Sequence, residues 1–167
     1  MDPLDPDNPQ ALLHPEGVAD FATLAQHLIE SARERVRILP QRVDLRYLVN
    51  PAVVTALREL ALQRRRARVE LLLLPGLARD GDGLALWNLA ARLPSSFTVH
   101  CLADEQASFS EALLTADTRG YLHRAQPDRL RGTACLDDAA GTRDMNQRFE
   151  ELWLASAPDP DARRLGL

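Results

Sequence analysis

Apolar residues recur along this chain with two periods, one typical of helices and the other of buried strands. A first helix is predicted from Asp20 to about Arg35, because its apolar residues follow helical spacing. Those residues are Phe21, Leu24, Ala25, Leu28 and Ile29. A short buried strand is predicted over residues 36–39, and residues 44–49 indicate either a second short strand or an irregular connection.

The middle of the chain alternates helix and strand. Asn50 followed by Pro51 predicts a helix start, because asparagine caps helices and proline suits the first helical position. This helix is predicted to end in three consecutive arginines, at 64–66. The predicted elements that follow are a strand at 69–74, a loop at 75–83, a helix at 84–93 and a strand at 97–102. Such alternation predicts a parallel sheet with helices on both faces.

The pattern changes after residue 110. Two strand-like runs, 111–116 and 121–124, flank Asp117-Thr118-Arg119-Gly120, which predicts a hairpin with a positive φ at the glycine. A short strand is predicted near 133–136. A final helix, 142–156, is predicted to carry on one face the residues Met145, Phe149, Leu152 and Trp153.

These elements define one α/β domain. We expect it to span residues 18–156, with a flexible arm at 1–17 and a tail at 157–167. Its sheet is predicted to be mostly parallel, with an antiparallel hairpin towards the C-terminal end and helices on both faces.

The amino-acid composition excludes several kinds of catalytic and binding site. All twenty basic side chains are arginine, so no lysine is present to form a Schiff base or to bind phosphate in a P-loop. The formal net charge of −4 does not give the basic field of a dedicated nucleic-acid binder. Cys101 and Cys135 lie outside any C-x-x-C pair, and no signal peptide or long apolar run is present. We therefore expect a cytoplasmic protein without a membrane anchor.

One segment carries a resemblance to a known family. Residues 110–117, Ser-Glu-Ala-Leu-Leu-Thr-Ala-Asp, and the later Phe-Glu-Glu-Leu-Trp at 149–153 resemble the end of a phospholipase D-like half-domain. The corresponding strand of that superfamily carries His-x-Lys-x-x-x-x-Asp. Alignment on Asp117 puts Ser110 in the histidine position and Ala112 in the lysine position. The nucleophile and the cation that holds the phosphate oxygens are both missing.

The resemblance implies a phospholipase D-like fold that has lost its catalysis. We therefore expect a non-catalytic binding or accessory domain in a bacterial cytosol, with no catalytic residue and no cofactor. Similar bacterial domains occur with acetyltransferase-like domains, which implies a protein partner. Active relatives with one motif dimerise, so the resemblance also implies a homodimer.

Arginine groups suggest an alternative function, a phosphate or nucleic-acid binding module. The first group is Arg64, Arg65, Arg66 and Arg68; the second, around the hairpin, is Arg119, Arg124, Arg129 and Arg131. The first group also fits a solvated helix end, because basic residues suit the negative end of the helix dipole.

Two other kinds of site have candidate residues in the sequence. A hydrolase with a relocated active site would need His123 to approach Ser110 across the hairpin. A zinc site would need ligands from His100, Cys101, His123 and Cys135, but their spacing matches no ligand pattern, so no metal is expected.

Overall fold

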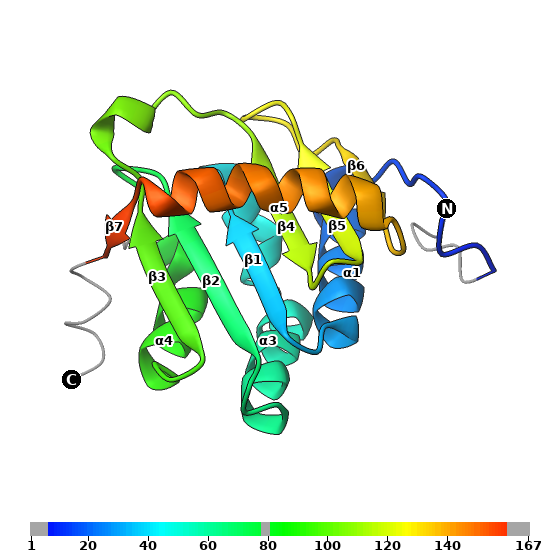
Figure 1. Cartoon of the computed structure of the whole chain (residues 1–167), viewed down its shortest axis with the longest axis horizontal. Coiled ribbons are helices and arrows are strands. Elements are labelled where there is room, and N and C mark those ends of the chain that lie inside the picture. Colours follow the sequence, from blue (N-terminus) through cyan, green and yellow to red (C-terminus); the bar gives the residue numbers. More distant parts are fainter. Residues whose placement is uncertain (1–6, 78–80, 160–167) are drawn as a thin grey trace.

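The computed structural model describes residues 7–77 and 81–159. Within them, a seven-stranded sheet has helices on both faces (Figure 1). The strands are β1 (Arg35–Leu39), β2 (Arg68–Leu73), β3 (Phe97–Cys101), β4 (Ala112–Ala116), β5 (Gly120–Arg124), β6 (Thr133–Cys135) and β7 (Ala157–Pro158). The helices are α1 (Gly17–Ser31), α2 (Leu45–Leu48), α3 (Pro51–Gln63), α4 (Leu84–Arg92) and α5 (Ala139–Leu154), with short turns η1 (Arg42–Asp44), η2 (Gly81–Gly83) and η3 (Asp104–Gln106).

The strand order is β6-β5-β4-β1-β2-β3-β7. Only the β1–β2 and β2–β3 pairs are parallel, and the other four pairs are antiparallel. The prediction of a mostly parallel sheet was therefore wrong. The connection from β3 to β4 contains η3 but no crossover helix, so β4 starts at the edge where β3 ends and runs back beside β1.

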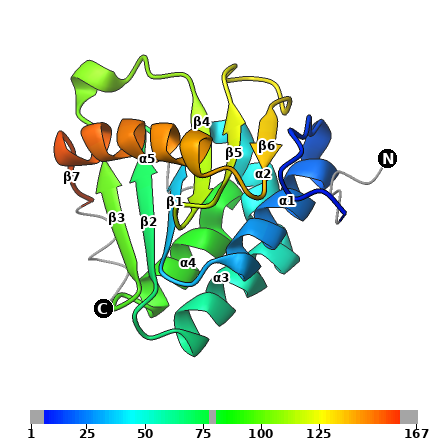
Figure 2. The same cartoon turned by 45° about the vertical axis from the view of Figure 1, so that its right-hand side comes forward.

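Side chains of β1 alternate between the two faces of the sheet. Val36 and Ile38 belong to the larger core, which lies between the sheet and helices α1, α3 and α4. Leu39 belongs to a smaller core with Phe149 under α5. Figure 2 shows α5 on one side of the sheet and the other long helices on the opposite side. The apolar face predicted for the last helix is confirmed, because its predicted members pack in or against this smaller core.

The local signals for the start of α3 and for the hairpin were correct, whereas α1 and α5 each begin three residues before the predicted start. Asn50 caps α3, with its Oδ1 accepting from the N–H of Ala52 at 2.9 Å. Residues 44–49 were predicted as strand or irregular, but they form α2 and its flanks. The hairpin is confirmed, although the positive φ of 54° belongs to Asp117 and not to Gly120. Gly120 is instead closely packed, because a Cβ there would lie 2.6 Å from Leu28 Cδ2 and 3.0 Å from the carbonyl oxygen of Leu136.

Both predicted flanking segments are partly docked on the sheet. In the predicted arm, Leu13 and Ala134 exchange backbone hydrogen bonds of 2.8 and 3.0 Å, which places the chain beside β6. In the predicted tail, β7 pairs with β3. The remaining predicted parts at 1–6 and 160–167, and residues 78–80 of the predicted loop, lie outside the described residues.

Candidate functional site

The degenerate motif lies at the edge of the sheet where β1 ends and β4 begins. Ser110 is exposed just before β4, and Ala112, the first residue of β4, is only 3% exposed. Gln41 holds this segment, because its Nε2 donates to the carbonyl oxygens of Phe109 and Glu111 at 2.9 and 3.0 Å. Neither motif position therefore supplies a nucleophile of the family type or a cation for phosphate oxygens.

The imidazole of His123, the histidine nearest to this motif, is hydrogen-bonded to a carboxylate. His123 Nε2 lies 2.9 Å from Glu111 Oε1, and Arg148 Nη1 donates to the two carboxylate oxygens of Glu111 at 3.1 and 3.3 Å. The described residues show no hydrogen bond between His123 and Ser110. The arrangement that a relocated hydrolase would need is thus not formed in this structure.

Arg124, predicted to bind phosphate, lies inside the protein. Its side chain is 1% exposed and pairs with Asp44, whose side chain is fully buried. Asp44 also accepts from the backbone N–H of Gln41 at 2.8 Å and from the hydroxyl of Tyr47. Burial, and then the Asp44 carboxylate, raise the pKa of Tyr47 well above its ordinary value. Arg124 is therefore engaged by Asp44 and has no exposed guanidinium to offer to the predicted phosphate site in this structure.

Asp117, the residue on which the motif was aligned, stabilises a turn of the backbone in this structure. Its Oδ2 accepts from the backbone N–H of Arg33 at 2.9 Å, and its Oδ1 accepts from those of Glu34 and Arg35 at 2.9 and 2.8 Å. These bonds fix the turn from α1 into β1. Asp117 stands at the opposite end of β4 from Ser110 and Ala112, because β4 separates them.

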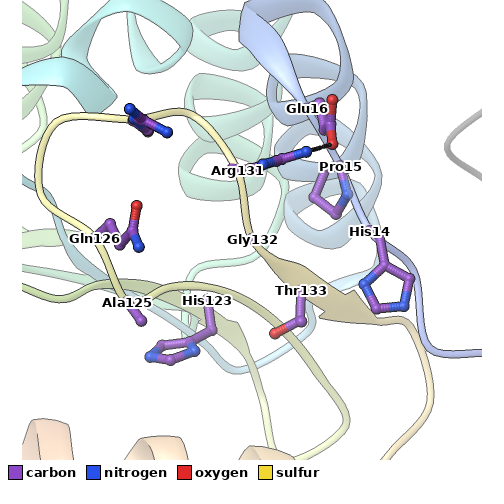
Figure 3. Close-up of a pocket in the computed structure, with 10 residues that line it drawn as sticks. His14, Pro15, Glu16, His123, Ala125, Gln126, Arg131, Gly132 and Thr133 are labelled. Atoms are coloured by element: carbon purple, nitrogen blue, oxygen red, sulfur yellow. Dashed lines mark hydrogen bonds and ion pairs between the residues drawn. The ribbon is translucent and has the colours of Figure 1, made fainter.

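A cavity of about 490 Å³ lies beside the degenerate motif (Figure 3). Its walls are the predicted arm, the end of β5 and the loop into β6; they are lined by His14, Pro15, Glu16, His123, Ala125, Gln126, Arg129, Arg131, Gly132 and Thr133. Arg131 joins the loop to the arm through Glu16, at 2.8 and 3.0 Å. Gly132 is required here, because a Cβ would lie 2.2 Å from the carbonyl oxygen of His123.

Some polar side chains that line this cavity have no partner among the described residues. The side chains of His14, Gln126 and Arg129 make no hydrogen bond or ion pair with the described residues, whereas Arg131 and His123 are held by Glu16 and Glu111. Among the described residues, Arg129 is thus a lining guanidinium without a carboxylate partner. A lining that includes a guanidinium, an imidazole, an amide and a hydroxyl offers donors that suit a small anion.

A second concave surface, here called the arginine groove, lies at the opposite end of β4. Its volume is about 920 Å³, and it is lined by Arg33, Glu34, Arg35, Arg37, Arg66, Arg68, Asp117, Thr118, Ala139, Arg143 and Asn146. These residues come from the starts of β1 and β2, the β4–β5 turn and the first turns of α5.

The predicted arginine groups are only partly brought together. Of Arg64, Arg65 and Arg66, only Arg66 lines the arginine groove. Arg119 is exposed in the β4–β5 turn and lies 3.3 Å from Asp137. Sequence reasoning missed Arg33, Arg35, Arg37 and Arg143. A signal for some of them was present, because arginines precede two parallel strands, and parallel strands begin at the same edge of a sheet.

The soft metal ligands do not gather. His100 stacks on Trp153 with ring centroids 3.8 Å apart and hydrogen-bonds Ser156 at 2.8 Å, while the sulfur of Cys135 faces the carbonyl of Pro9. Within residues 7–77 and 81–159, no cluster of three or more histidine, cysteine or carboxylate side chains is arranged for a metal ion. In the same ranges, no helix combines the length and apolar character of a membrane span.

Several solved structures share this fold at 12% sequence identity. TrmBL2, an archaeal chromatin protein with a novel mode of DNA binding, matches with a TM-score of 0.66 over 95% of this chain and 57% of its own. Nuc from Salmonella typhimurium, a phospholipase D family member, matches with a TM-score of 0.62 over 89% of this chain and 97% of its own. NucT from Helicobacter pylori matches with a TM-score of 0.63 over 89% and 100%.

These similarities show a phospholipase D-like fold. The chain spans just over half the length of the archaeal chromatin protein and nearly the whole of the two others. No curated protein sequence matches it. Residues 17–165 match the model of a family described as a domain of unknown function (DUF7931), and the chain belongs to that family.

Proposed function

We propose that this chain is a non-catalytic phospholipase D-like binding domain that holds a small organic phosphate in the cavity beside its degenerate motif. The observation that carries the proposal is that a cavity lined by exposed polar side chains lies next to a motif that lacks its reactive groups. Arg129 and His14 line the cavity, whereas Ser110 and Ala112 occupy the histidine and lysine positions.

The absence of catalysis in this proposal follows from the groups that phosphoryl transfer requires. A nucleophile must be activated by a base, and the negative charge that develops on the phosphate oxygens must be met by a cation. Ser110 makes no hydrogen bond to a base among the described residues. Arg124, opposite Ala112 in the hairpin, is already neutralised by Asp44. Binding without turnover is the outcome that these residues support.

The cavity itself supports a compact ligand. Its volume of about 490 Å³ falls in the range of small-molecule sites, roughly 300–1,000 Å³. The walls are held by hydrogen bonds: Gly132 N–H donates to the carbonyl of Pro15 at 3.2 Å, and Arg131 contacts Glu16. A site that is already formed loses less entropy on binding. Nuc, a phospholipase D family member with the same fold, adds support for this chemical class.

The test is ligand-dependent stabilisation measured with adenosine monophosphate and, separately, adenosine as probes. A ligand at about 100 times its dissociation constant stabilises the folded state by about 2.7 kcal/mol. We expect adenosine monophosphate to raise the melting temperature of the parent and adenosine to leave it unchanged. The variant Arg129→Ala should lose the shift, while Arg92→Ala, an exposed arginine on α4, should keep it. No phosphate-dependent shift in the parent, or an equal shift in Arg129→Ala, would overturn the proposal.

A further inference from the structure

The arginine groove lies apart from the cavity of the proposed function. The hairpin separates them, because β5 begins beside the Asp117 turn at the groove and ends at the cavity with His123. The groove is lined by six arginines and two carboxylates, a formal excess of four positive charges in a chain whose net charge is −4. Such a local excess of positive charge raises the concentration of anionic ligands near this surface.

The fold forces these guanidinium groups together. Arg35 and Arg68 are direct neighbours in the parallel β1–β2 register, and like charges in such positions are destabilising. Glu70 offsets part of this repulsion, because its Oε1 lies 3.4 Å from Arg35 and 3.0 Å from Arg37. Arg37 is neutralised again by Glu150, so its side chain is fully engaged.

Four other arginines keep their charge uncompensated. Arg33, Arg66 and Arg143 are exposed, and their side chains make no hydrogen bond or ion pair with the described residues. Arg68 donates only to the backbone carbonyls of Arg65 and Ala67, both at 3.0 Å. The one carboxylate at the centre of the lining, Asp117, already accepts three backbone N–H bonds.

The lining also limits the kind of anion. It contains no aromatic side chain, so it offers no platform on which an unpaired base could stack. Arginine forks match phosphate oxygens, and several forks along one open groove match a run of phosphates better than a single one. From this geometry we infer that the arginine groove binds the phosphate backbone of a double-stranded nucleic acid without reading its sequence.

The test measures anisotropy of a fluorescein-labelled DNA duplex of about 20 base pairs, titrated with the full chain at several salt concentrations. Four phosphate contacts give a slope of log affinity against log salt of about −3.6, so affinity should fall about 150-fold from about 50 to about 200 mM salt. Two duplexes of unrelated sequence should bind alike. A single strand of the same length should bind more weakly.

The decisive variants carry equal changes in charge. Arg66→Ala with Arg143→Ala should weaken duplex binding at least about tenfold and reduce the magnitude of the salt slope by about two. The control pair, Arg58→Ala with Arg92→Ala, lies on α3 and α4 across the sheet and should leave both quantities unchanged. Absence of duplex binding at low salt, equal weakening by both pairs, or stronger binding of the single strand would overturn the inference. Because all four arginines are exposed, circular dichroism should show unchanged folding for both pairs.

Discussion

Removing Asp44 should destabilise this protein more than removing any exposed charge. Asp44 is fully buried and accepts from three partners: the Arg124 guanidinium, the N–H of Gln41 and the hydroxyl of Tyr47. In Asp44→Ala the Arg124 cation would stay buried without an anion, which costs about 3–5 kcal/mol. That loss is a large part of the roughly 5–15 kcal/mol by which domains are stable. It corresponds to a fall in melting temperature of about 6–20 °C.

The double variant gives the sharper comparison. Nη1 of Arg124 has no hydrogen-bond partner among the described residues, so the buried pair is not fully satisfied. Replacing both partners, in Asp44→Ala with Arg124→Met, removes the uncompensated charge and should therefore cost less than Asp44→Ala alone. The exposed pair Glu16 and Arg131 is the matched control, and its removal should cost at most about 1 kcal/mol.

Urea unfolding followed by circular dichroism measures all of these variants. If Asp44→Ala costs no more than the exposed control, the buried ion pair is not a dominant source of stability. If the double variant is less stable than Asp44→Ala, the unpaired guanidinium is not the source of the loss.

Three more predictions concern single positions. Gly132→Ala should cost about 1–3 kcal/mol in chemical unfolding, because its Cβ would meet the carbonyl oxygen of His123, whereas Gly81→Ala, in open space, should stay within about 0.5 kcal/mol. Asp117→Ala should lower the free energy of unfolding by about 1–2 kcal/mol, because the backbone hydrogen bonds to its carboxylate are lost. Asp117→Asn should cost less, because asparagine retains one acceptor and tolerates a positive φ. Equal losses in the two variants would contradict this. Burial lowers the pKa of His100, and the Glu70 carboxylate opposes this effect only in part, so the midpoint of its NMR titration should lie below about 6.5. The contribution of His100 to the free energy of unfolding should be present above that pH and lost as the pH falls below it. A midpoint at or above about 6.5 would contradict the structure.

Elements set by local chemistry were predictable from the sequence. Asn50-Pro51 marks the start of α3, the hairpin follows from the turn residues after Ala116, and the apolar stripe of α5 includes Phe149, which is fully buried. Each of these signals lies within one turn or one helix, so neighbouring residues decide it.

Features that join distant segments were not predictable in the same way. The order of strands in the sheet depends on β4 pairing with β1, not with β3. The alternation of strands and helices along the sequence does not specify this pairing. Arg124 looked like a surface arginine because its partner Asp44 lies 80 positions earlier. Similarly, the arginine groove combines residues near 33, 66 and 143, whereas the sequence showed only the adjacent arginines at 64–66.

The central claim is that this phospholipase D-like domain binds phosphate ligands without cleaving them. The most direct measurement is hydrolysis of bis(p-nitrophenyl) phosphate by the purified full chain, compared with buffer and with the variants Ser110→Ala and His123→Ala. With Ser110 and Ala112 in the reactive positions, release of p-nitrophenol should equal the background in all samples. Turnover above background in the parent that either variant abolishes would contradict the account.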